Sequence, residues 1–171
     1  MVHGDPQQRS ARLAEVTEIL RREAQPEERE LLLSLAPILF AGMPARLALD
    51  LEAPAVAARV LLHFRFVARE MPPGHQLYTG LPGIHVSVRN PSEEEARVLG
   101  GGAGLPLETT IVQTHTPDRP FIFDSVKNYL QKSGLRVYSA IHPIFTVRRQ
   151  WERIVSLGGP QEEGSRESYC F

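Results

Sequence analysis

The hydrophobic period of this chain changes near residue 76, and that change constrains the fold more than any other feature. Up to about residue 75, apolar side chains recur at helical spacing, as at Val56, Val60 and Phe64. Beyond that point, residues 84–90 (IHVSVRN) alternate apolar and polar side chains, which is the period of a half-buried strand. Helices followed by strands are typical of the α+β class, so we expect an α+β protein.

The first part of the chain predicts three helices. One is expected over residues 10–24 and another over residues 54–70, both with apolar stripes. Between them, Pro26 stands where the first turn of a helix tolerates proline. Pro37 lies ten residues further on and should end or kink that second helix.

The second part predicts strands around a single helix. The helix is expected over residues 122–135, with Gly134 as a left-handed C-cap in a Schellman ending. Its expected inner face consists of Ile122, Val126, Tyr129 and Leu130. The expected strands, rich in β-branched and aromatic residues, cover residues 107–116, 136–149, 152–157 and 167–171.

Composition and charge exclude several classes of protein. The 19 Lys and Arg residues balance 20 Asp and Glu residues, so no nucleic-acid or membrane partner is expected. The N-terminus lacks the apolar core of a signal peptide, and Cys170, the single cysteine, cannot form an internal disulfide. We therefore expect a cytoplasmic chain. Because its last residues read as an unfinished strand, we expect it to be the front piece of a longer protein.

Catalytic and metal-binding motifs are weak in this sequence. The six histidines form no HExxH pair and are interpreted as half-buried strand residues. The glycines of residues 100–104 (GGGAG) precede no Gly-Lys-Ser/Thr and are interpreted as a linker. His115, Asp124 and Ser125 could be cast as a hydrolase triad, but Ser125 lies outside any G-x-S-x-G turn. We nominate no catalytic, cofactor-binding or metal-binding residue.

The turn that leads into the single helix of the second part is the best candidate site. A helix N-terminus there could bind a carboxylate or phosphate. It could equally be a packed helix start, in which Pro120 sets the first turn and Asp118 caps it. The residues nominated for an effector or interface turn are Asp118, Arg119, Pro120, Phe121, Asp124 and Ser125.

The segment DRPFIFDSVKNYLQKSGLRV (residues 118–137) resembles the ACT-type regulatory module, with Asp-Arg-Pro, a helix, Gly-Leu and then a strand. A wider stretch, residues 109–149, is similar to the N-terminal region of the large bacterial NAD-specific glutamate dehydrogenases. In that family a similar PF-apolar-apolar-DSV turn leads to Gly-Leu, IHP and VRR. LLHFRFVARE (61–70) and VSVRNP (86–91) resemble its helical lead-in and a strand ending in Asn-Pro.

The resemblance implies a fold and a division of the chain. The expected fold is a helical N-terminal segment (1–75), a strand with a Gly-rich linker (76–108), and a partial ACT-like domain (109–171). The complete module is a ferredoxin-like βαββαβ antiparallel sheet with helices packed on it. Its second helix and last strand are expected to be missing or to lie beyond Phe171, which leaves an open sheet edge that favours self-association.

The resemblance also implies a function for the longer protein. The full-length enzyme would deaminate L-glutamate oxidatively to 2-oxoglutarate with NAD, whereas this chain would hold no cofactor and be inactive alone. Its partners would be the remainder of the enzyme, a second copy of itself, or an amino-acid effector. Effector-binding ACT modules carry Gly where this chain has Phe121, so we expect the phenyl ring to fill the space that a ligand would need. A free-standing amino-acid sensor that binds at Asp118–Phe121 is the alternative.

Overall fold

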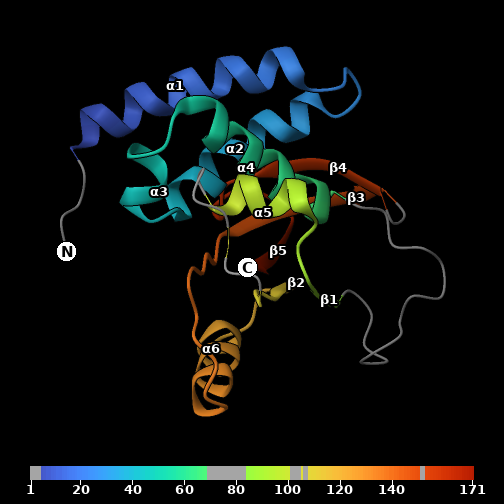
Figure 1. Ribbon diagram of the computed structural model, residues 1–171. Helices are drawn as coiled ribbons and strands as arrows, with labels where there is room; N and C mark the ends of the chain where they lie inside the picture. Colours follow the sequence, from blue (N-terminus) through green and yellow to red (C-terminus); the bar gives the residue numbers. More distant parts are fainter. Residues whose placement is uncertain (1–4, 69–83, 101–104, 106–107, 151–152) are drawn as a thin grey trace.

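The computed structural model describes residues 5–68, 84–100, 105, 108–150 and 153–171. The protein is α+β, as the change of hydrophobic period predicted: helices come first, and an open five-stranded antiparallel sheet follows (Figure 1). Its helices are α1 (Pro6–Glu23), α2 (Arg29–Gly42), α3 (Ala45–Leu49), α4 (Ala53–Val67), α5 (Glu93–Gly100) and α6 (Ile122–Lys132). Its strands are β1 (His85–Arg89), β2 (Ile111–Pro117), β3 (Ile144–Gln150), β4 (Arg153–Gly158) and β5 (Ser165–Cys170).

The helical layer forms the larger part of the hydrophobic core. The apolar stripe of α4 is fully buried, so the helix predicted for residues 54–70 is confirmed as far as Val67. Residues 69 and 70 lie outside the described part of the chain. Pro37 does not end α2, which continues to Gly42 because Leu39 and Phe40 bury their side chains beyond the proline. That burial offsets the backbone hydrogen bond that a proline inside a helix removes.

Two helices were missed by the sequence analysis. One is α3, a single short turn of helix. The other is α5, which follows β1 directly and begins with a reciprocal capping box: the Glu95 amide donates to Ser92 Oγ, and the Ser92 amide donates to the Glu95 carboxylate. The Ser-x-x-Glu spacing at residues 92–95 was the signal that could have predicted α5. Its last residue is Gly100, and residues 101–104 of the expected linker lie outside the described part.

The strand order is β1-β2-β5-β3-β4, and every pairing is antiparallel. Because β2 and β3 are both antiparallel to β5, they run parallel to each other with β5 between them. Since α6 connects β2 to β3, these elements form the split βαβ unit of ferredoxin-like folds. The far side of β2 is taken by β1 from an earlier part of the chain, and β1 and β4 form the two edges.

The long strand expected over residues 136–149 is shorter than predicted. The regular strand β3 starts at Ile144, directly after Pro143. Before the proline, Ile141 exchanges both backbone hydrogen bonds with Phe171, so pairing with the last strand resumes there. The proline cannot donate a ladder hydrogen bond, which explains the interruption.

The two faces of the sheet differ in their cover. One face carries Phe145, Val147 and Tyr169, which pack into the core together with the helices. Figure 1 shows α1–α4 on one side of the sheet and α6 alone on the other. No residue of α6, which the structure describes in full, is fully buried. Of the predicted inner face, Ile122, Val126 and Leu130 are half-buried, whereas the prediction is wrong for Tyr129, which is 72% exposed. The Schellman ending is confirmed, since the Leu135 amide donates to the Leu130 carbonyl and Gly134 has φ 77°.

Candidate functional site: the turn before α6 and the groove beside it

The turn before α6 joins β2 to the helix and is open to solvent. Asp118 does not cap α6; its carboxylate pairs with Arg166 on β5 at 3.0 Å, and its amide donates to the Arg166 carbonyl at 2.9 Å. Arg119 and Pro120 are exposed. The aspartate therefore fastens the turn to the neighbouring strand, which differs from the helix cap considered from the sequence.

Phe121 is the N-cap residue of α6 and adopts the left-handed conformation, with φ 68° and ψ 2°. It is the only non-glycine residue with a positive φ in the described part of the chain. A side chain with a Cβ is strained there, because the left-handed region costs L residues roughly 1–2 kcal/mol. Glycine would adopt this conformation without strain, and glycine is the residue that the ACT pattern carries at this position.

The phenyl ring of Phe121 does not fill the turn, contrary to the expectation from the sequence. Its side chain is 77% exposed. The aromatic residue that packs is Phe123, whose ring stacks on His142 with centroids 4.9 Å apart. Strained backbone beside an exposed aromatic ring is characteristic of binding surfaces rather than of packed helix starts.

The three residues considered as a hydrolase triad are not assembled into one. Asp124 and Ser125 lie exposed in the first turn of α6, where the Ser125 amide donates to the Phe121 carbonyl. His115 is buried on β2, and its Nε2 lies 2.5 Å from Glu167 Oε2 on β5. The histidine is thus occupied by a strand partner on the sheet.

The buried polar side chains between sheet and helices form two connected groups. In the first, the Tyr169 hydroxyl lies 2.9 Å from His63 Nδ1 on α4 and accepts a hydrogen bond from Gln113 Nε2 at 2.9 Å. Burial, reinforced by the nearby guanidinium of Arg59, lowers the pKa of His63 to about 3. Burial also raises the pKa of Tyr169, so both groups are neutral at physiological pH.

The second group contains His115, Glu167 and Arg149. Arg149 donates two hydrogen bonds to the Glu167 carboxylate, at 2.8 and 3.1 Å. Burial alone would raise the pKa of Glu167, but the hydrogen bonds from His115 and Arg149 outweigh it and hold that pKa at about 2. The first group joins α4 to β2 and β5, whereas the second, partly exposed, joins β2, β3 and β5, so both have a structural role.

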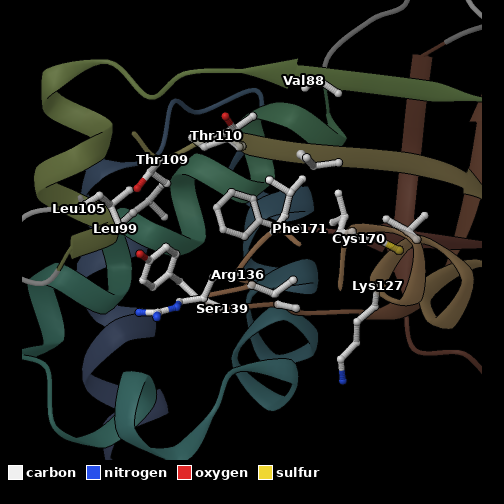
Figure 2. Close-up of a pocket in the computed structure, with 18 of the residues that line it drawn as sticks. Val88, Leu99, Leu105, Thr109, Thr110, Lys127, Arg136, Ser139, Cys170 and Phe171 are labelled. Atoms are coloured by element: carbon white, nitrogen blue, oxygen red, sulfur yellow. The ribbon is translucent and has the colours of Figure 1, made fainter. Parts of the chain in front are cut away.

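A groove of about 760 Å³ lies between α6 and the face of the sheet that the helical layer leaves open. Figure 2 shows Val88 on the edge strand, Cys170 and Phe171 at the end of β5, and Lys127 on α6 around this groove. Burial raises the pKa of the Cys170 thiol. The groove could not be predicted from the sequence, because the wall of the groove depends on where α6 lies relative to the sheet.

Other chemistry is restricted in the part of the chain that the structure describes. No group of three or more His, Cys, Asp or Glu side chains there could hold a metal ion. None of the described helices combines the length and apolar character needed to cross a membrane. The two lysines of the sequence, Lys127 and Lys132, lie exposed on α6.

The split βαβ unit, the strand–turn–helix junction at Asp118 and the helical layer define an ACT-like α+β domain. Comparison with protein families gives a match to the family described as glutamate dehydrogenase, ACT1 domain, over residues 35–170. The match covers most of the chain, and the chain belongs to this family, which confirms the resemblance drawn from its motifs. Neither the comparison with curated proteins nor the comparison with solved structures gives a match.

Proposed function

We propose that this chain is a regulatory and assembly domain of an NAD-dependent glutamate dehydrogenase. The observation that carries the proposal is the family match over residues 35–170. In the proposed full-length enzyme, other parts of the polypeptide bind NAD and deaminate L-glutamate to 2-oxoglutarate. This domain contributes contacts and effector control, since its described residues offer binding surfaces and a polar network whose hydrogen bonds are structural.

Steady-state assays of the isolated chain test whether catalysis belongs to other parts of the proposed enzyme. With glutamate and NAD, we expect no increase in NADH absorbance above the protein-free rate, because the two lysines lie on an exposed helix away from any buried acid–base pair. Turnover that co-purifies with the chain through two chromatographic steps would contradict the proposal.

The assembly role is supported by exposed apolar side chains on and after α6. Tyr129, Leu135 and Tyr138 are each at least half exposed, at 72%, 57% and 50%. Exposed apolar side chains on a helix and the segment that follows it are typical of interaction surfaces. We expect the chain to self-associate in sedimentation velocity at micromolar concentration, and Tyr129→Glu to shift it toward the monomer. Identical sedimentation of wild type and variant would argue against α6 as the contact.

An amino-acid sensor at the Asp118–Phe121 turn is the second candidate, supported by the exposure of Phe121, which leaves the turn open. Isothermal titration calorimetry of the chain against the common amino acids tests it. If the turn binds, Phe121→Gly should bind at least as tightly as wild type, since the backbone becomes more accessible. Absence of saturable heat for both proteins would remove this candidate while leaving the assembly role intact.

A further inference from the structure

The groove beside α6 contains a buried cation whose charge is not neutralised. Arg59 on α4 lines the groove, and only 4% of its surface is exposed. Its terminal nitrogen donates to the Leu99 carbonyl, whereas its Nε has no hydrogen-bond partner. None of the carboxylates in the described ranges forms an ion pair with it.

A guanidinium in this position is unfavourable without an anion. Burying an unpaired charge costs several kcal/mol, and buried charges in proteins are usually paired. Burial lowers the pKa of Arg59, in agreement with a site that is short of negative charge. A carboxylate that reached the guanidinium would be desolvated there and would form a strong charge-assisted hydrogen bond.

The groove is lined by further charged and polar groups. Figure 2 labels Arg136, Lys127 and Thr109 among its lining residues. The Arg136 guanidinium lies 5.9 Å from the centroid of the Tyr138 ring. One acid, Glu108, also lines the groove. Two arginines and one lysine against one glutamate give the lining of the groove a net positive charge.

The rest of the groove is apolar. Val88 and Val112 are opposite each other in the β1–β2 register, and Cys170 is paired with Thr114 on the same face. The wall formed by α6 contributes Val126 and Leu130. Val88 on the edge strand remains 64% exposed, whereas Ser168 and Thr146 further along the same face are buried, so the apolar surface that lacks cover lies at the β1 edge.

We propose that this groove binds an amphipathic carboxylate, with the carboxylate at Arg59 and an unbranched apolar chain lying between α6 and the open face of the sheet. The volume of about 760 Å³ lies in the range of small-molecule sites. Such sites combine an apolar lining with a few polar groups that fix orientation, which is the distribution found here. The site stands on the groove alone and does not depend on the enzyme to which the domain belongs.

The first test separates the contributions of charge and chain. Calorimetry of the 171-residue chain with octanoate, decanoate and 1-octanol should give saturable binding of both carboxylates, with octanoate at least tenfold tighter than the alcohol. Decanoate should bind more tightly than octanoate by roughly fourfold for each added methylene group. Equal affinity for octanoate and 1-octanol, or no saturation with decanoate, would overturn the proposal.

The second test uses matched variants. Arg59→Met keeps the length and apolar stem of the side chain, and replacing a buried charge in this way is often neutral for stability. We expect it to weaken octanoate binding about ten- to hundredfold and to leave 1-octanol binding unchanged. Unchanged octanoate affinity in a folded Arg59→Met protein would rule out the carboxylate site.

A pair of substitutions on α6 keeps the test decisive if Arg59→Met does not fold. Leu130→Glu places a negative charge in the groove wall, whereas Asn128→Glu adds the same charge on the exposed surface of the helix outside the groove. Asn128 is exposed and Leu130 is half-buried, so we expect both variants to fold, which circular dichroism checks. Octanoate binding should fall at least tenfold in Leu130→Glu only, and equal affinities in the two variants would contradict the proposal.

Discussion

One face of the sheet is sealed by α2 and α4, whereas the other meets solvent along the groove beside α6. On the sealed face, Phe145 and Tyr169 have no exposed surface, and the Tyr169 hydroxyl is hydrogen-bonded to His63 and Gln113. On the open face, Val88 at the edge strand is 64% exposed, whereas Ser168 and Thr146 are buried. One sheet therefore serves two purposes: the sealed face supplies the stability that allows the β1 edge of the open face to remain uncovered for binding.

Truncation on the sealed face should produce the largest effect. Phe145→Ala removes a side chain with no exposed surface and leaves a cavity, so the free energy of unfolding should fall by about 3–5 kcal/mol. Urea denaturation followed by circular dichroism measures it. Tyr129→Ala, on the helix of the open face, is the matched control and should change stability by less than about 0.5 kcal/mol. Similar losses for the two variants would show that the faces contribute equally.

Acid should destabilise the protein through the sealed face first. The pKa of His63 falls from 6.5 to about 3 on folding, so below pH 6.5 the unfolded state binds the proton and the folded state does not. Stability is therefore complete above about pH 6.5 and declines as the pH falls toward 3, by up to about 1.4 kcal/mol per pH unit.

Replacing the histidine isolates its share of this pH dependence. In His63→Gln, whose amide can still bond the Tyr169 hydroxyl, the decline between pH 6.5 and 4.5 should largely disappear. Below pH 4.5 a loss should remain, because the pKa of Glu167 lies at about 2 in the folded protein and its stabilising hydrogen bonds disappear as it is protonated. Urea midpoints measured across this range give the slope, and a variant with the wild-type slope above pH 4.5 would exclude His63 as its origin.

Relief of backbone strain at Phe121 should change the free energy of unfolding least, and it should stabilise the protein rather than destabilise it. Phe121→Gly removes the Cβ from a residue in the left-handed conformation, which relieves strain. Glycine also adds entropy to the unfolded chain, which offsets part of the gain. We expect the free energy of unfolding to rise by about 0.5–1 kcal/mol in total. Phe121→Ala keeps the Cβ and should show no such gain. If thermal melts show the glycine variant to be less stable, the exposed ring makes a stabilising contact on the open face.

The sequence was most informative where a pattern reports burial directly. The stripe of α4 was predicted residue by residue, because each apolar position at helical spacing has a place in the core. The Schellman ending of α6 was also predicted, since Gly134 and Leu135 specify it locally. By contrast, α6 has an apolar stripe of which Ile122, Val126 and Leu130 are only half-buried. The stripe showed that a buried face was available, without showing that anything covers it.

The candidate site also has a part that the sequence predicted and a part that it did not. The turn at residues 118–121 was found from its local motif, whereas its use of Asp118 was not, because the partner Arg166 lies on a strand far along the chain. The groove and Arg59 could not be predicted, since α4, β2 and α6 come together there only in three dimensions. Tertiary packing decides whether an arginine on the buried side of a helix forms an ion pair with a carboxylate or lines a groove.

The sequence alone was enough for the α+β class, for the helix and strand order of residues 109–171, and for the glutamate dehydrogenase ACT1 kinship, since these depend on period, turn chemistry and spaced motifs. Only the tertiary structure decided that β1 lies beside β2, that Phe121 is strained and exposed, and that one face of the sheet is open. The physical reason is that local propensity acts over a few residues, whereas register, cover and burial of charge are set by contacts between distant segments.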